Sequence, residues 1–210
     1  MSWKAKIVTM RPMPESPKPL VPGAHEHPSL ALVDSVEGGA PGRSSDALST
    51  PEGATAWLAE HDLIAPEAVL YEHCQRRLVG LREDLRDLFT AHVTGDCPSP
   101  EALDAVNRAL TSAPGALLLR FDPTVRFSRS VDHPATQVVE HAMAVIAEDA
   151  ASLLTGSEEP SLAACEAPSC QWFFLRTHAR RQWCSTRCGD RVRAARAYAR
   201  KRAQRSGPVR

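Results

Sequence analysis

Apolar residues recur at spacings of three and four along four stretches of the chain. This pattern predicts four amphipathic helices, each with one buried face. The signals that begin them are Thr50–Pro51, Pro66, Ser99–Pro100 and Asp132–Pro134, and Gly95 and Gly156 end the second and the fourth. Between the third and the fourth helix this period is lost. Two short apolar stretches, 116–121 and 124–128, flank Asp122–Pro123, which predicts a β-hairpin.

The second helix carries the longest apolar stripe. Its predicted inward residues are Val69, Leu70, Leu78, Leu81, Leu85, Leu88 and Phe89, and those of the third helix are Leu103, Val106 and Leu110. Upstream, residues 29–36 form a short apolar stretch of strand or helix, and the Gly- and Ser-rich residues 37–50 predict a loop. Residues 29–155 therefore predict one mainly helical domain with a small β-hairpin, an α+β domain with a core of its own.

The two ends of the chain differ from this domain. Six prolines within residues 1–28 predict a flexible Pro-rich arm. Residues 156–161 predict a short polar linker. Residues 162–206 predict a separate module that is too small to fold without a stabilising cross-link, such as a bound metal or disulfides. No apolar run approaches the roughly 20 residues of a membrane-spanning helix, and the first residues lack the apolar core of a signal peptide. We therefore expect a cytoplasmic protein with no membrane partner.

Charge is divided unevenly along the chain, although the formal net charge is zero. Residues 161–210 carry 12 Lys and Arg against 2 Asp and Glu, a net charge of +10, and residues 1–160 carry 13 against 23, a net charge of −10. A run of charged residues usually marks only a solvent-exposed face. A surplus of ten positive charges on so short a module is larger than such a face requires. It favours a nucleic-acid partner for the C-terminal module.

Four of the six cysteines fall in this basic module, at the spacing Cys165-x4-Cys170-x13-Cys184-x3-Cys188. Two short-spaced pairs of thiolates suit the tetrahedral coordination of zinc, and a complete set of four leaves no open position for water. The spacing therefore predicts one structural Zn²⁺, whose binding energy is folding energy for the module. Unrelated free cysteines and an iron–sulfur cluster are the alternatives, and Cys74 and Cys97 are expected to be ordinary residues of the helical domain.

Arginines surround and follow the cysteines. The predicted nucleic-acid contacts are Arg180, Arg181, Arg187, Arg191, Arg193, Arg196, Arg200 and Lys201. A segment rich in Ala and Arg predicts a helix over about 191–205, capped by Asp190. Val192, Ala195 and Ala199 are expected to form its apolar seam, which leaves the arginines free to face phosphates and guanine edges.

Five aromatic residues share the module. They are Trp172, Phe173, Phe174, Trp183 and Tyr198. We expect them to form a small core against the metal site. The alternative is that one ring is exposed and stacks on a nucleobase.

The C-terminal zinc finger of the CGNR family resembles the stretch from Cys165 to Arg202, CEAPSCQWFFLRTHARRQWCSTRCGDRVRAARAYARKR. The family motif has two cysteines, an aromatic stretch, a Trp-Cys-Ser step, a Cys-Gly-Asn-Arg run and a basic helix. The matching residues are Cys165, Cys170, Trp172, Phe174, Trp183, Cys184, Ser185, Cys188, Gly189 and Arg191. Asp190 stands where the family has Asn, which is a nearly neutral change in a helix cap.

The resemblance covers about residues 29–206 and implies a bacterial stress-associated transcription regulator. It implies that the helical domain senses an unknown small-molecule effector and that the finger contacts DNA. We expect no enzyme, because the sequence has no Gly-rich phosphate loop, no Gly-x-Ser-x-Gly and no His-Glu-x-x-His. Three alternatives stay open: RNA in place of DNA, a homodimer, and a protein-interaction module whose basic part docks on an acidic partner.

Overall fold

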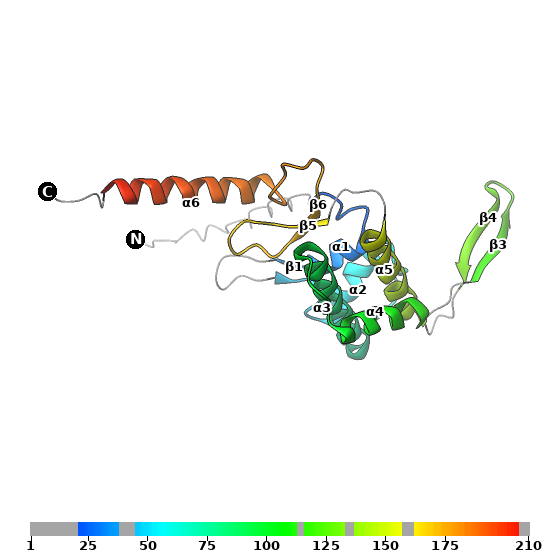
Figure 1. Ribbon diagram of the computed structural model, residues 1–210. Helices are drawn as coiled ribbons and strands as arrows, with labels where there is room; N and C mark the ends of the chain where they lie inside the picture. Colours follow the sequence, from blue (N-terminus) through cyan, green and yellow to red (C-terminus); the bar gives the residue numbers. More distant parts are fainter. Residues whose placement is uncertain (1–20, 38–44, 113–115, 133–136, 157–161, 206–210) are drawn as a thin grey trace, which may run out of the picture.

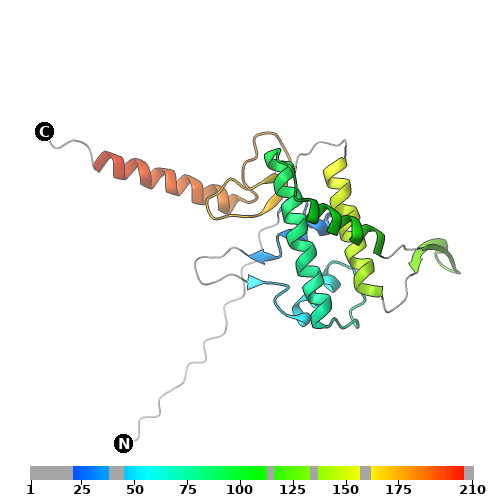
Figure 2. The same ribbon diagram turned by 60° about the horizontal axis from the view of Figure 1, so that its bottom comes forward.

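The structure, a computed structural model, describes residues 21–37, 45–112, 116–132, 137–156 and 162–205. A helical body lies in the middle of Figure 1, a β-hairpin stands away from it on one side, and a small C-terminal finger continues into a long helix on the other. Figure 2 shows the same three parts after rotation, with the hairpin and the long helix again pointing away from the body. The predicted fold class, mainly α with a small hairpin and a cysteine module that ends in a helix, is confirmed.

The body consists of five helices. They are α1 (Pro28–Val33), α2 (Pro51–Glu60), α3 (Glu72–Thr94), α4 (Pro100–Ser112) and α5 (Val138–Thr155). The long helix that continues from the finger is α6 (Thr186–Arg205). The strands form three antiparallel pairs: β1 (Val36–Glu37) with β2 (Ser45–Asp46), β3 (Ala116–Asp122) with β4 (Arg126–Asp132), and β5 (Leu162–Ala164) with β6 (Phe173–Leu175). Leu30, Leu58, Leu85, Phe89 and Ile146 are fully buried and bring α1, α2, α3 and α5 into one core. Among the described residues, no helix combines the length and the apolarity needed to cross a membrane.

Two predicted helix ends are built as the sequence indicates. The Thr50 hydroxyl oxygen accepts the Gly53 N–H at 3.1 Å and caps α2, with Pro51 in the first turn. Gly95 ends α3 with a left-handed φ of 79°, a conformation that glycine adopts without steric cost.

Three predicted features of the body are wrong. The fourth helix, α5, begins at Val138 and not at Asp132, because Asp132 is the last residue of β4 and pairs with Ala116. The second helix begins at Glu72 instead of Pro66, because the Leu70 N–H donates to the Thr55 hydroxyl at 3.2 Å and holds the preceding chain in an irregular path. Val69 is therefore outside the helix and 74% exposed. Leu103 is 46% exposed, because α4 turns the small residues Ala102 and Ala109, with Val106, toward the core.

The predicted hairpin forms around Asp122–Pro123. Asp122 pairs with Arg126, so the loop has three residues. The Asp122 carboxylate accepts the N–H groups of Thr124 at 2.7 Å and Val125 at 3.0 Å, as short side chains do in tight turns. Arg126 closes the loop with a left-handed φ of 69°, the geometry of three-residue hairpin loops.

Part of the segment predicted as a flexible arm is attached to the fold. Residues 1–20 lie outside the described part, but Val21 is buried in the finger, and the Pro22 carbonyl accepts the Leu175 N–H at 3.0 Å. Gly23 has a φ of 89°, and a Cβ there would lie 2.7 Å from Leu175. His27 is hydrogen-bonded to Asp149 of α5 at 2.8 Å. Residues 21–27 thus run between the finger and the body.

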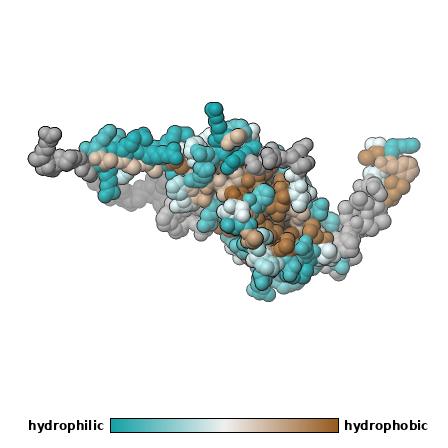
Figure 3. Space-filling view, in the orientation of Figure 1, coloured by the Kyte–Doolittle hydropathy of each residue, from teal (hydrophilic) through white to brown (hydrophobic). Residues whose placement is uncertain are grey.

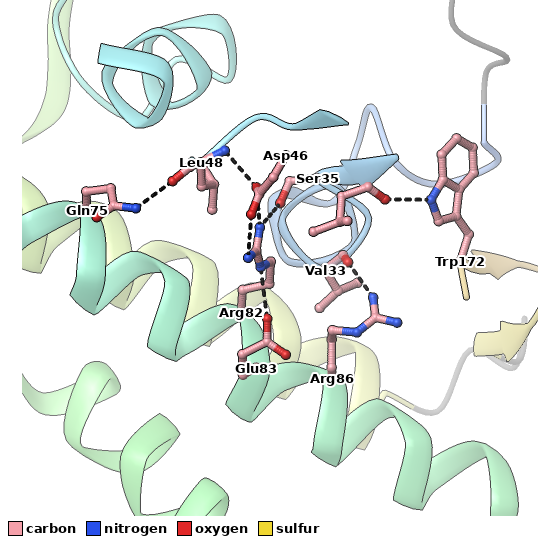
Figure 4. A network of polar contacts seen from close by, with 10 residues as sticks. Val33, Ser35, Asp46, Leu48, Gln75, Arg82, Glu83, Arg86 and Trp172 are labelled. Atoms are coloured by element: carbon pink, nitrogen blue, oxygen red, sulfur yellow. Dashed lines mark hydrogen bonds and ion pairs between the residues drawn. The ribbon is translucent and has the colours of Figure 1, made fainter. Parts of the chain in front are cut away.

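A buried ion pair ties the β1–β2 pair to α3 (Figure 4). Arg82, only 4% exposed, donates to both carboxylate oxygens of Asp46, at 2.7 and 3.0 Å, and to the Ser35 hydroxyl at 3.0 Å. The hydrogen bond from Arg82 lowers the pKa of Asp46, despite partial desolvation. This pair was not expected, because the Gly- and Ser-rich composition of residues 37–50 predicts a loop.

We expect Arg82→Met to lower the free energy of unfolding by about 3–5 kcal/mol at pH 7, because it leaves a partly buried carboxylate without its cation. Since the pKa of folded Asp46 is lowered, this stability is present above about pH 4 and is lost as pH falls through the folded pKa. The deficit of the variant should therefore shrink toward pH 3. Urea denaturation at both pH values measures it. Arg76→Met, which breaks an exposed pair with Glu72, is the control and should cost at most about 0.5 kcal/mol.

Candidate metal centre and nucleic-acid interface

The finger is built on a strand whose alternate residues enter two different cores. In β6, Phe174 is fully buried beside Cys165, Cys184 and Val192 in a small cluster of the finger. Successive side chains of a strand point to opposite faces, so Phe173 enters the helical core. There it packs edge-to-face on Phe89 at 5.7 Å. One strand thus joins the finger to the body.

The four cysteines predicted as metal ligands converge on one point. Their sulfur atoms all lie within 4.8 Å of one another, and three of the separations are 3.6 Å (Cys184 to Cys188), 3.8 Å (Cys170 to Cys184) and 3.8 Å (Cys170 to Cys188). Sulfurs at about 2.3 Å from a tetrahedral zinc lie about 3.8 Å apart, so the donor set fits this ion. Cys74 packs against the helical core and Cys97 is exposed, both outside this set.

Crowding of the thiols shifts their pKa values apart. Hydrogen bonds with Cys170 and Cys184 lower the pKa of Cys165, and the same hydrogen bonds raise the pKa of Cys184 and Cys170. Four thiolates at this spacing therefore need a cation to balance them. A bound zinc ion supplies that charge, since a thiol that coordinates a metal is deprotonated.

The basic helix begins inside the metal centre. It starts at Thr186, so Cys188 lies in its first turn, four residues after Cys184. The Ser185 hydroxyl accepts the Cys188 N–H at 3.3 Å and acts as the cap. The prediction of Asp190 as the cap is therefore wrong. Asp190 lies within the helix and accepts a hydrogen bond from Arg193 at 2.7 Å.

Gly189 allows a close stack at the start of α6. The guanidinium of Arg193 lies over the Trp183 ring at 5.9 Å. A Cβ at Gly189 would lie 3.1 Å from both Arg193 and Trp183. The close approach explains why a glycine occupies this helical position.

Most of the predicted nucleic-acid contacts lie on open surface. Those exposed are Arg180, Arg187, Arg191, Arg193, Arg196, Arg200 and Lys201. Arg181 instead donates to the carbonyls of Trp183 at 3.1 Å and Cys184 at 2.9 Å, so its donors are used within the finger. Figure 3 shows α6 as an almost continuous hydrophilic rod.

The predicted apolar seam of this helix is only partly correct. Val192 is 7% exposed and packs in the finger, but Ala195 and Ala199 are exposed, because α6 extends beyond the finger. Of the aromatic residues, Phe173 and Phe174 are buried, Trp172 and Trp183 are partly buried, and Tyr198 is 70% exposed on α6. The predicted aromatic core therefore forms without Tyr198. Phe173 belongs to the core of the body, and Phe174, Trp172 and Trp183 belong to that of the finger.

Three polar contacts fasten the finger to the body. The Trp172 indole N–H donates to the Val36 carbonyl at 3.2 Å, as Figure 4 shows, and the Phe173 N–H donates to the Asp34 carboxylate at 3.1 Å. Arg86 of α3 bridges the two parts, donating to the Val33 carbonyl at 2.6 Å and to that of Gln171 at 2.9 Å. These contacts join residues far apart in the chain, and no local pattern in the sequence indicates them.

Asp34 is half-buried, and its Oδ2 atom is buried with no hydrogen-bond partner within the described residues. Burial raises its pKa well above the usual range, although the Phe173 N–H and Arg86 oppose this. The folded state therefore favours the neutral acid, and the wild-type protein loses stability as pH rises above about 4. Asp34→Asn keeps the acceptor for Phe173, so we expect it to raise the free energy of unfolding by about 1–3 kcal/mol at pH 7, with no gain near pH 3.5. Thermal denaturation at the two pH values tests this, with the exposed Asp104→Asn as the control.

Two family models match the chain. The ABATE model, described as "Putative stress-induced transcription regulator", matches residues 26–157, and the model of the CGNR zinc finger matches residues 161–201. The first match covers α1 to α5 with the hairpin, and the second covers the four cysteines and most of α6. No curated protein matches the chain. The chain therefore belongs to the ABATE family, and it carries a CGNR zinc finger with four cysteines positioned to bind one structural zinc ion.

Proposed function

We propose that this protein is a DNA-binding regulator of the bacterial cytoplasm that acts in a stress response and has no catalytic role. In this proposal α6 contacts DNA, and the helical body senses a small-molecule effector. The observation that carries the proposal is an exposed, arginine-rich helix that starts at a metal centre. The family membership supports a role in transcription, and the charge of the helix supports the partner.

The helix has the length and surface for a duplex. Its 20 residues span about 30 Å at 1.5 Å per residue. Beyond Val192, almost all residues of the helix are exposed, and the basic side chains lie on several of its sides. Arg is suited to such a site, because its planar guanidinium pairs with phosphate and with the guanine edge in the major groove, which admits an α-helix.

The metal centre acts as the anchor of this helix. Cys188 is a ligand and belongs to the first turn of α6, and the Arg191 guanidinium lies 3.5 Å from the Cys188 sulfur. The bound ion therefore holds the direction of the helix relative to the finger. The contacts of Phe173, Trp172 and Arg86 then hold the finger on the body. A change of the body on binding an effector would reach α6 along this route.

RNA and an acidic protein are the competing partners. The basic residues favour nucleic acid over a protein surface, because Arg191, Arg196 and Lys201 lie on different sides of the helix. A flat acidic surface would use one side only. The choice between DNA and RNA does not follow from charge, because both present phosphates.

Sequencing of nucleic acid crosslinked to the protein in cells tests the proposal. We expect DNA fragments that fall in promoter regions. Recovery of RNA would reassign the function to RNA binding, and recovery of neither above the level of an Arg193/Arg196/Arg200→Ala variant would favour the protein-interaction module.

A further inference from the structure

The β3–β4 hairpin exposes an apolar face. Phe121 and Phe127 are opposite each other in the register, with ring centroids 5.1 Å apart, yet they are 55% and 66% exposed. Leu119, on the same face, and Val125, in the loop, are each 69% exposed. In Figure 3 this face forms a hydrophobic patch away from the body. Contiguous apolar surface of this kind typically marks an interaction site.

The hairpin is also incomplete as a sheet. It has only two strands, so each strand presents an unpaired edge. An isolated two-stranded hairpin is marginal in water, and it is stabilised by further strands or by packing of its apolar face. In Figures 1 and 2 the hairpin stands away from the helices of the body. The described residues of one chain therefore leave this apolar face exposed.

A cavity with mainly apolar walls lies in the body. Its volume is about 420 Å³, and it lies between the α2–α3 connection and the start of α5. Leu63, Ile64, Ala68 and Val138 give it apolar walls, and the exposed Asp62 places a carboxylate at the cavity. β4 ends at Asp132 and α5 begins at Val138, so the hairpin is connected to this same end of α5.

We propose that two copies of this chain form a dimer in which the hairpins lie antiparallel and each tip enters the cavity of the other copy. A strand of seven residues reaches about 23 Å, so the hairpin carries its own tip away from its own cavity. Two hairpins placed side by side in opposite directions put each tip at the base of the other. The cavity at that base then receives the partner's tip.

Charge and shape agree with this arrangement. Val125 is an exposed apolar residue of the tip, and it meets apolar walls in the cavity. Arg126, also exposed at the tip, meets Asp62 of the other copy. Pairing of the hairpin edges adds main-chain hydrogen bonds. The proposal stands independently of DNA binding.

The first test is the mass of the full-length protein in solution. Sedimentation over roughly 1–100 μM should show a dimer of twice the chain mass of 22.9 kDa. The double substitution Phe121→Ser/Phe127→Ser should weaken the dimer at least about 100-fold, because it removes the apolar face. Leu103→Ser/Tyr198→Ser removes exposed apolar side chains of α4 and α6, 46% and 70% exposed, outside the hairpin and the cavity, and it should leave the dimer unchanged.

The second test exchanges the charges. Arg126→Asp and Asp62→Arg should each weaken the dimer, and a mixture of the two variants should form a heterodimer in which both ion pairs are restored. A helix signal like that of the wild type in circular dichroism confirms that each variant is folded. The proposal is overturned by a wild-type monomer at all concentrations, by a dimer that tolerates the hairpin variant, or by a hairpin variant that loses only nucleic-acid binding.

Discussion

Cys184→Ser is expected to remove the bound metal and to unfold the finger. Cys184 is fully buried, and its sulfur lies within 3.8 Å of both Cys170 and Cys188. Loss of one thiolate breaks a closed set of four ligands. Since the binding energy of a structural zinc is about 10–16 kcal/mol and is also folding energy, the small module has no other term of this size. Elemental analysis should find about one zinc per wild-type chain and essentially none in the variant.

The structure extends this prediction to the rest of the chain. The first turn of α6 contains Cys188, so the basic helix should lose its anchor and part of its helicity. The body should stay folded but less stable, because Leu162 and Phe173 of the finger belong to its core. Cys97→Ser, at an exposed cysteine, is the matched control and should keep one zinc. A Cys184→Ser protein with a full equivalent of zinc would refute the assignment of the ligands.

Arg193/Arg196/Arg200→Ala is expected to weaken binding to every duplex by roughly 100- to 1,000-fold at about 0.1 M salt, if each arginine neutralises one phosphate. The three residues share one side of α6 at spacings of three and four. Sequence preference should change little, because contacts to phosphates carry no base information. The measurement is competition among several duplexes, and retained zinc shows that the finger is intact.

Arg193 needs a separate control, because it also stacks on Trp183 and pairs with Asp190. The double variant Arg196→Ala/Arg200→Ala leaves this stack in place and should still lose roughly 10- to 100-fold. Arg76/Arg77/Arg108→Ala removes the same number of charges from the body and should leave affinity nearly unchanged. If the body variant lost as much affinity as the α6 variant, the binding surface would not be α6.

The metal centre follows from sequence more directly than the rest of the site. Zinc requires four donors at fixed distances, so the spacing of the cysteines limits what they can do. The three-residue gap between Cys184 and Cys188 is one helical turn, and it was a usable sign that the helix starts before Asp190. The Ala- and Arg-rich pattern predicts the helix only from about Arg191, so the cap at Ser185 was not expected.

The junction of finger and body could not be predicted in the same way. Trp172 donates to the backbone of Val36, and a backbone acceptor leaves no mark in the sequence. The pairing of Arg82 with Asp46 depends on how β1 and β2 meet α3, which local periodicity does not specify. The adjacent phenylalanines of β6 indicate part of this junction. Neighbouring residues of a strand face opposite sides, so two buried phenylalanines in succession require an apolar core on each side.

The central claim, that α6 binds nucleic acid through its phosphates, is tested most directly by fluorescence anisotropy of a labelled duplex at several salt concentrations. For the wild-type protein we expect the logarithm of affinity to fall against the logarithm of salt concentration with a slope of roughly −4 to −5, which corresponds to about four to six neutralised phosphates. Arg193/Arg196/Arg200→Ala should flatten that slope by roughly 3 while the zinc is retained. An unchanged slope in this variant would contradict the account and assign the basic helix to a protein partner.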